Sequence, residues 1–177
     1  MEYYWAVPDP DYTDAPRLLD FHEKLNMNDF YLDRSYDMPK RTVIQVHPNE
    51  HMDFVDYLFQ SAPLFTDKAM KVIWRFDNDF TYKEVILLSA QSGSNELYYL
   101  PFFQRFPPNV VLEPAPHQML EKPSAIPELK IPYPLPVFFV FLQHKCLLFM
   151  RLDLIESLLR NGARGLGLRK AIVCVGG

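Results

Sequence analysis

Residues 137–173 read VFFVFLQHKCLLFMRLDLIESLLRNGARGLGLRKAIV, and this stretch decides the fold. Two apolar runs, 137–142 and 146–150, flank the polar tripeptide Gln143-His144-Lys145, a pattern that indicates two strands joined by a turn. Their continuous apolarity indicates either burial on both faces or very strong packing on one. A helix is expected next, and the apolar residues of 166–173 return the chain as a last strand. The stretch therefore predicts strand, turn, strand, helix, strand.

The helix in this stretch has signals at both ends. Asp153 is predicted to cap its N-terminus, with Glu156 three residues later in the position of a capping box. Arg160 suits the negative end of the helix dipole, and Gly162 is placed for the left-handed residue that ends many helices. The predicted buried face consists of Leu154, Ile155, Leu158 and Leu159.

The first part of the chain gives shorter elements. Residues 3–7 form an aromatic strand that stops at Pro8, because a proline cannot donate to a central ladder. Residues 41–47 are a second strand with β-branched content. An irregular connection is expected over residues 26–41, and a strand followed by a turn is favoured over a short helix at 51–60.

Two short helices are predicted before residue 80. Asp14 can cap the first, and Thr66 is a good N-cap for the second, at about residues 67–76. In each helix, side chains at i, i+3, i+4 and i+7 fall on one face, as expected for a stripe that packs on a sheet. These stripes are Leu18, Phe21, His22 and Leu25 in the first helix and Ala69, Val72, Ile73 and Phe76 in the second.

The middle of the chain predicts a hairpin and then an extended arm. Residues 83–89 and 96–100 flank a turn-rich spacer, which predicts an antiparallel hairpin. Residues 107–136 contain nine prolines, a density that excludes helix and predicts an extended arm packed over the surface, with 110–112 as an edge strand. A disordered linker is the alternative, but the large apolar side chains in the segment favour packing. A chain of 177 residues is expected to form one domain. The predicted fold class is α+β, with a mixed or mainly antiparallel sheet packed by two or three helices.

Charge is unevenly distributed along the chain. Residues 1–65 carry 12 acidic and 5 basic side chains, whereas residues 66–177 carry 10 acidic and 13 basic ones, for a net charge of −4. This balance argues against general nucleic-acid binding, which needs a basic face. The acidic first third is a candidate for meeting a basic partner, and a solvated acidic face is the alternative interpretation.

Composition also bears on the expected location. The N-terminus has no basic region followed by an apolar run of signal-peptide length, so a cytoplasmic location is expected. The most apolar region, 131–150, is broken by prolines and by Gln143-His144-Lys145, so no membrane association is expected. Cys146 and Cys174 are expected as reduced, buried thiols.

Candidate catalytic and metal-binding patterns are incomplete. His47, Glu50 and His51 are spaced somewhat like zinc ligands, but Pro48 opposes the continuous helix of the His-Glu-x-x-His motif. Asp77-Asn78-Asp79 starts like a calcium loop that lacks its glycine and its terminal glutamate. We therefore expect no metal and no cofactor. The alternative hypothesis is a small enzyme of unknown reaction, with its site near His47, Glu50 or His144.

Three blocks of the sequence resemble immunity proteins of bacterial polymorphic toxin systems. They are the opening strand EYYWAV, the block DKAMKVIWRFDNDFTYKEVILLS followed by ELYYLP, and the closing segment RLDLIESLLRNGARGL. The resemblance implies a non-enzymatic protein that binds a cognate toxin and blocks it. It supplies no catalytic residues.

An inhibitor of this kind needs a surface patch with aromatic anchors, and acidic side chains can steer it to a basic toxin site. The first third of the chain contains both kinds of residue. A third hypothesis is a self-associating accessory protein that uses the proline-rich arm, and homo-oligomers are compatible with either binding role. The predicted partner-binding residues are Tyr12, Asp29, Tyr31, Asp33, Tyr36 and Asp37.

Overall fold

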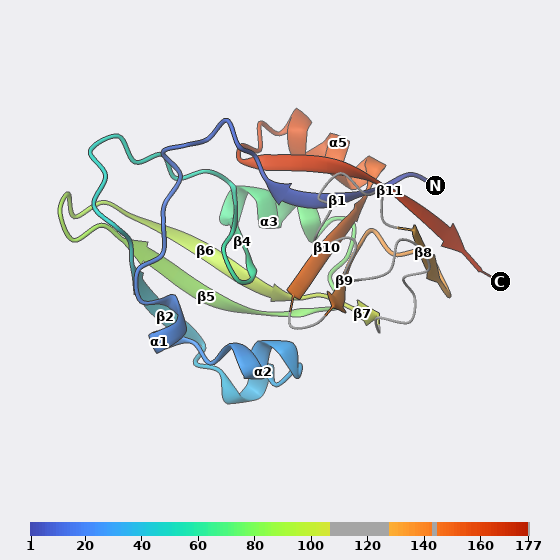
Figure 1. The fold of residues 1–177 in the computed structure, drawn as a ribbon, viewed down its shortest axis with the longest axis horizontal. Coiled ribbons are helices and arrows are strands. Elements are labelled where there is room, and N and C mark those ends of the chain that lie inside the picture. Colours follow the sequence, from blue (N-terminus) through green and yellow to red (C-terminus); the bar gives the residue numbers. More distant parts are fainter. Residues whose placement is uncertain (107–127, 143–144, 177) are drawn as a thin grey trace.

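The computed structural model describes residues 1–106, 128–142 and 145–176, which form two β-sheets with short helices around them (Figure 1). The first sheet contains β1 (Tyr3–Pro8), β7 (Arg105–Phe106), β8 (Glu128–Ile131), β9 (Val137–Leu142), β10 (Lys145–Arg151) and β11 (Leu166–Val175). The second contains β2 (Arg41–Gln45), β3 (Tyr57–Phe59), β4 (Pro63–Thr66), β5 (Thr81–Leu88) and β6 (Asn95–Phe102). The helices are α1 (Phe21–Lys24), α2 (Met27–Tyr31), α3 (Asp67–Ile73), α5 (Leu152–Arg160) and the 3-10 turn η1 (Ser35–Asp37).

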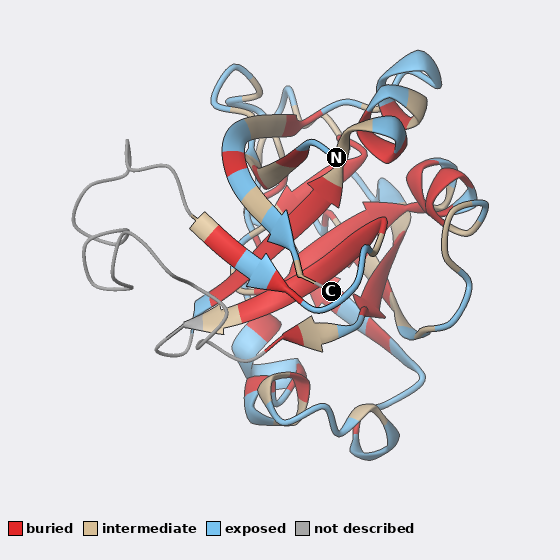
Figure 2. Cartoon of the chain, turned by 90° about the vertical axis from the view of Figure 1, so that its right-hand side faces the viewer, coloured by how far each residue is buried: buried red, intermediate tan, exposed pale blue. Residues whose placement is uncertain are grey.

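The six-stranded sheet is built around the predicted β9–β10 hairpin. Its strand order is β7-β9-β10-β1-β11-β8, and β1 is inserted antiparallel between β10 and β11. Side chains of β9 alternate between two hydrophobic clusters, because Phe139 belongs to one and Phe138 to the other. The strand is therefore buried on both faces, which decides between the two arrangements that its continuous apolarity allows, and Figure 2 shows this buried centre.

The five-stranded sheet has the order β2-β5-β6-β4-β3 and contains the predicted β5–β6 hairpin, paired antiparallel from Thr81↔Phe102 to Leu88↔Asn95. Strand β4 was not predicted from the sequence. It runs directly into α3, whose N-cap is Thr66 as expected; the Thr66 hydroxyl accepts a hydrogen bond from the Ala69 N–H at 3.5 Å. The α+β class is confirmed, and the strands are divided between two sheets.

Helix α5 departs from the prediction at its start. It begins at Leu152, and its N-cap is Arg151, which has extended backbone as the last residue of β10. Asp153 lies inside the first turn, where its carboxylate accepts two hydrogen bonds from the Arg151 side chain at 2.7 and 2.8 Å. The strand continues into the helix without a loop, so Arg151 occupies the N-cap position and Asp153 already lies within the helix. Leu159 is also wrong as a buried residue, since it is 49% exposed.

The helix expected after Asp14 is shorter and starts later. Leu18 forms an antiparallel bridge with Val46, and the Leu19 N–H donates to the Gln45 carbonyl at 2.8 Å, so α1 starts only at Phe21. Asp14 instead accepts a hydrogen bond from the Asn49 side-chain amide at 3.2 Å. Pairing with β2 therefore outweighs the local capping signal.

Other predictions are settled only in part. Residues 107–127, including the expected edge strand at 110–112, lie outside the described residues, as do Gln143 and His144. The part of the proline-rich segment that is described includes β8, which pairs parallel with β11 at the edge of the sheet.

Cys146 is buried and free as expected, but Cys174 is exposed, because it lies on the outer part of the last strand. Within the described ranges, no helix has the length and apolarity that crossing a membrane requires.

Candidate functional site

The structure brings five of the six predicted partner-binding residues together. Residues Asp29 and Tyr31 lie on α2, Asp33 lies in the turn after it, and Tyr36 and Asp37 lie on η1. Helix α2 lies below β5 in the view of Figure 1, at the edge of the molecule. We call the outward side chains of this segment the α2–η1 surface; they are Asp29, Leu32, Asp33, Tyr36 and Asp37.

Tyr12 does not join this group. It lies in the loop after β1, is half-buried and packs against the larger hydrophobic cluster. Backbone hydrogen bonds connect this loop to the loop after β2, from Asp53 to Asp14 and from His47 to Arg17, each at 2.9 Å. The residues predicted as one interface therefore lie on two separate parts of the surface.

Local sequence explains why α2 forms in a segment expected to be irregular. The Asn26 side chain caps the helix by accepting a hydrogen bond from the Asn28 N–H at 3.1 Å. Met27 and Phe30, three residues apart, are buried beneath it. Asp33 then has a φ of +59°, a left-handed conformation that Asp tolerates better than most residues. A helix with only two buried positions is too short to show periodicity, so the capping residue was the one available signal.

Large apolar side chains are exposed on this surface. Tyr36 is 78% exposed and Leu32 is 58% exposed, so both can be buried by a partner. Tyr31, by contrast, is half-buried and packs edge-to-face on Phe30 and Phe141, and burial raises the pKa of its phenol. The anchors available to a partner are therefore Tyr36 and Leu32. Leu32 carries neither the aromatic ring nor the charge that marks an interface residue in the sequence, so only its exposure reveals it.

The charge of the segment is mixed. Among the described residues, the carboxylates of Asp29 and Asp37 make no ion pair and no side-chain hydrogen bond, which leaves them available to a basic partner. Arg34 and Lys40 are exposed in the same segment. Specific pairing is therefore a better description of this surface than a uniform acidic field.

Arg105 is a residue of this site that sequence reasoning missed. It comes from β7, far away in the chain, and its side chain is only 14% exposed. Its Nη1 donates to the Tyr31 carbonyl at 2.9 Å, and its Nε lies 3.4 Å from Asp33 Oδ1. Burial lowers the pKa of the guanidinium, and the carboxylate of Asp33 opposes that shift. The predicted interface is thus contacted by Arg105, a basic residue of the same chain and not of a partner.

A cleft of about 590 Å³ lies beside the α2–η1 surface. Its walls combine carboxylates, hydroxyls, amides and phenyl rings. The hydroxyl of Thr81 donates to that of Ser35 at 3.3 Å, which connects β5 to η1. The lining residues are Asp33, Ser35, Asn78, Asp79, Phe80, Thr81, Phe102, Phe103, Gln104 and Arg105.

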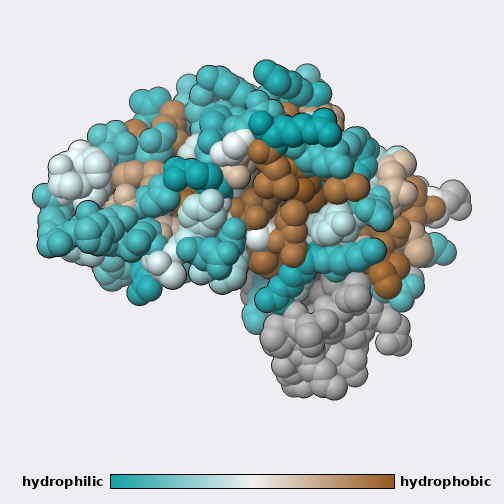
Figure 3. Space-filling view, turned by 90° about the horizontal axis from the view of Figure 1, so that it is seen from above, coloured by the Kyte–Doolittle hydropathy of each residue, from teal (hydrophilic) through white to brown (hydrophobic). Residues whose placement is uncertain are grey.

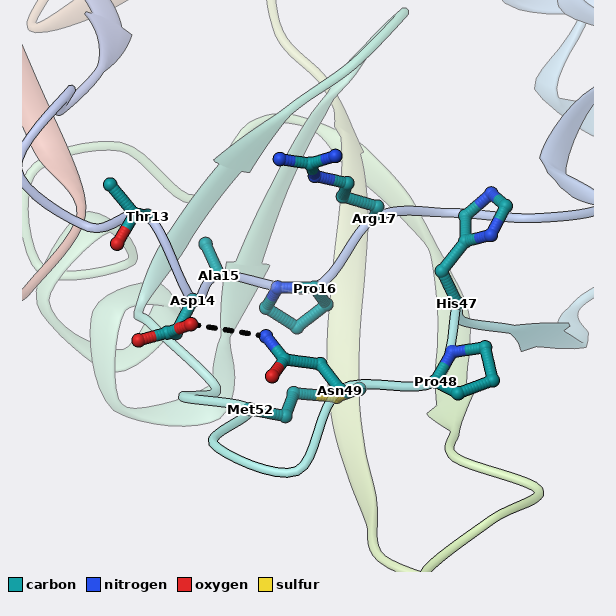
Figure 4. A pocket seen from close by; sticks show the side chains of 9 residues that line it. All are labelled: Thr13, Asp14, Ala15, Pro16, Arg17, His47, Pro48, Asn49 and Met52. Carbon is teal, nitrogen blue, oxygen red and sulfur yellow. Dashed lines mark hydrogen bonds between the residues drawn. The ribbon is translucent and has the colours of Figure 1, made fainter.

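A second pocket, of about 350 Å³, contains one of the residues named for the enzyme hypothesis (Figure 4). His47 lines it together with Asp14, Arg17 and Asn49, and the dashed line in Figure 4 marks the bond between Asn49 and Asp14. Glu50 is not among its lining residues, and His144 lies outside the described residues. In the described part of the chain, His47 makes no side-chain hydrogen bond to a nucleophile or to an acid.

A hydrophobic groove of about 520 Å³ lies elsewhere, where β1 ends and β11 begins. Figure 3 shows hydrophobic side chains gathered over these strands. Trp5, Leu168 and Arg169 line the groove, and the Arg169 guanidinium lies 5.3 Å from the centre of the Trp5 ring. None of the predicted partner-binding residues lines it.

Comparisons with known proteins add no assignment: no protein-family model matches the chain, and no curated protein matches it. Among the residues that the structure describes, no group of three or more His, Cys, Asp and Glu side chains is placed to hold a metal ion.

Proposed function

We propose that this protein is a non-enzymatic immunity protein that binds and neutralises a cognate bacterial toxin in the cytoplasm. The observation that supports this most is the exposed Tyr36, which lies between Asp33 and Asp37 on the α2–η1 surface. Tyrosine is enriched at the energetic centres of interfaces because it buries a large area and keeps a polar end. The resemblance to immunity proteins supports the same role.

The proposed contact combines burial with specific charges. Tyr36 and Leu32 supply large side chains that a partner can remove from water. The unpaired carboxylates of Asp29 and Asp37 pair with Lys or Arg of the toxin and raise the association rate. A toxin with a basic contact surface therefore fits, and inhibition follows if the complex covers that surface.

Co-expression with the product of the neighbouring gene tests the role. The proposal predicts a complex that survives purification and restores growth to cells expressing that product. A neighbouring product that is harmless and does not bind would count against an immunity function.

A second experiment localises the contact. Reversing both unpaired charges, Asp29→Lys with Asp37→Lys, should slow association and change its dependence on salt concentration. The control is Asp11→Lys, an exposed carboxylate in the loop that holds Tyr12, and it is compared also with the single variant Asp37→Lys, which changes the net charge by the same amount. If the control slows association and the double variant does not, the interface lies on the loop after β1.

The enzyme hypothesis has less support. His47 does line a pocket, but Glu50 does not join it there. General acid–base catalysis needs a second group within hydrogen-bond reach of the substrate or of the base. Turnover that depends on His47 would favour this rival function.

A further inference from the structure

We propose that Arg105 is the positioning residue of the α2–η1 surface, and that Asp33 acts through Arg105 rather than by contacting the partner. The inference rests on the proposed function, because that function makes the α2–η1 surface the binding surface for a partner. It divides the predicted aspartates into two roles. Asp29 and Asp37 are contact residues, and Asp33 holds the turn between them through its pair with Arg105.

The first argument is the geometry around α2. The Nη1 of Arg105 donates to the carbonyl of Tyr31, the last residue of the helix, at 2.9 Å. Its Nε lies 3.4 Å from the Asp33 carboxylate, two residues further along. One guanidinium therefore holds both the end of α2 and the turn that leads to η1.

The second argument is the aromatic surround of the guanidinium. Its central carbon lies 4.6 Å from the ring centre of Phe141, 5.1 Å from that of Phe30 and 5.8 Å from that of Phe102. These distances are within the range of cation–π attraction. The rings belong to β9, α2 and β6, so Arg105 connects the helix to both sheets.

The third argument is charge balance. The Nε and Nη2 atoms are buried and make no hydrogen bond, so the Asp33 carboxylate compensates the charge through an ion pair with Nε. A buried cation is costly unless a counter-charge compensates it. Among the described residues, Asp33 supplies the only carboxylate at ion-pair distance. Removing either partner should therefore loosen the segment that both hold.

The fourth argument concerns the backbone of Asp33, whose φ of +59° is a conformation that the surrounding structure must support. The contact with Arg105 provides this support from one side, and the backbone bond from the Asp33 N–H to the Phe30 carbonyl at 3.2 Å provides it from the other. A carboxylate used in this way is already committed within the chain, although its side chain is 59% exposed.

Hydrogen exchange on the free protein tests the positioning role without any partner. Arg105→Met and Asp33→Asn should each speed exchange of the amides of residues 30–37 at least about tenfold, through local opening. Amides of the β5–β6 hairpin should keep their wild-type exchange rates. Arg105→Lys retains the charge but loses the fork of donors, so we expect an intermediate effect. The double variant should add little to either single one, because the two residues act as a pair.

Unchanged exchange at residues 30–37, or an equal increase throughout the chain, would overturn the proposal. The second outcome would make Arg105 a general core residue. If Arg105→Met does not fold, Asp33→Asn still tests the pair, because its side chain lies largely in solvent.

Binding kinetics separate the two roles of the aspartates. Asp37→Asn should weaken the salt dependence of association, whereas Asp33→Asn should leave that dependence unchanged and mainly raise the dissociation rate. An equal change in salt dependence for both variants would make Asp33 a contact residue and contradict the proposal. Failure to find any complex would count against the proposed function, while the exchange result would still decide the role of Arg105.

Discussion

At the scale of single residues, Gly165 holds a place that no other residue type fits. Its φ is +84°, and an added Cβ would lie 2.7 Å from the Val55 side chain and 2.8 Å from the Tyr57 carbonyl oxygen. The chain after α5 therefore passes very close to β3, and only the absence of a side chain allows it. Gly162 also has a positive φ, of +71°, but nothing lies within 4 Å of its added Cβ.

This pair of glycines gives a matched test. Gly165→Ala should lower the free energy of unfolding by about 3 kcal/mol or more, since backbone strain and steric overlap add. Gly162→Ala should cost only about 1 kcal/mol, from backbone strain alone. Urea denaturation of both variants measures the difference. Equal losses would show that β3 moves aside to accept the methyl group.

Two buried tyrosine phenols and one buried cysteine thiol predict how the stability of the protein changes at high pH. Burial raises the pKa of the Tyr57 and Tyr98 phenols and of the Cys146 thiol above their ordinary values of 10.0 and 9.0. Below about pH 8 both folded and unfolded states keep these protons, so the three groups add no pH dependence there. At higher pH the unfolded state loses protons that the folded state retains, and the protein loses stability.

The expected loss is up to about 1.4 kcal/mol per pH unit for each group, beginning near pH 9 with the thiol. Urea denaturation between about pH 8 and about pH 11 measures it. Cys146→Ala should be less stable near pH 8 but should show a shallower decline at higher pH. A flat profile for the wild-type protein would contradict the burial of these groups.

At the scale of elements, Asp56 connects three segments that are distant in sequence. Its buried carboxylate accepts hydrogen bonds from the Thr66 hydroxyl at 2.6 Å and the Arg164 N–H at 2.9 Å, and pairs with Lys68 at 2.8 Å. The start of α3, the approach to β3 and the loop after α5 are thus held at one point. Lys68 also donates to the Gly162 carbonyl at 2.8 Å, which reinforces the contact between α3 and α5.

Asp56→Ala should lower the free energy of unfolding by about 2–4 kcal/mol, because it leaves the buried hydroxyl and N–H donors without an acceptor. The control is Glu156→Ala on α5, where an exposed pair with Arg160 is lost and the cost should be at most about 0.5 kcal/mol. Chemical denaturation of both variants checks the prediction. Comparable small losses would mean that solvent or a neighbour replaces the carboxylate.

Helix starts show what local sequence can and cannot predict. Thr66 was predicted correctly because its hydroxyl acts on an N–H only three residues away. Asp153 was predicted wrongly because the start of α5 is set by the end of β10, where Arg151 pairs with Tyr3 of β1. Asp14 failed for the same reason, as Leu18 is held by Val46. Tertiary pairing decided both cases.

At the scale of the whole molecule, the class was predictable but the division into two sheets was not. Each hairpin could be read from adjacent apolar runs. The insertion of β1 between β10 and β11 joins residues 142–168 positions apart in the chain, and no local pattern encodes such a pairing. Arg105 was missed for a related reason, because its aromatic neighbours come from residues 30, 102 and 141.

The candidate site was likewise predictable only in its local features. The sequence pointed to the tyrosines and aspartates of residues 29–37, which the structure places on α2, in the turn after it and on η1. The sequence did not reveal that Tyr31 packs inward or that Asp33 pairs with Arg105. These features depend on β7 and β9, which pack against α2 only in the folded chain.

The most direct measurement of the central claim is the dissociation constant of the toxin complex for Tyr36→Ala. Tyr133→Ala is the control, since Tyr133 is 46% exposed and lies outside the α2–η1 surface. If the protein binds its toxin through this surface, Tyr36→Ala should weaken the complex by at least about 30-fold and Tyr133→Ala by less than about threefold. Wild-type affinity for Tyr36→Ala would contradict the account and place the interface elsewhere.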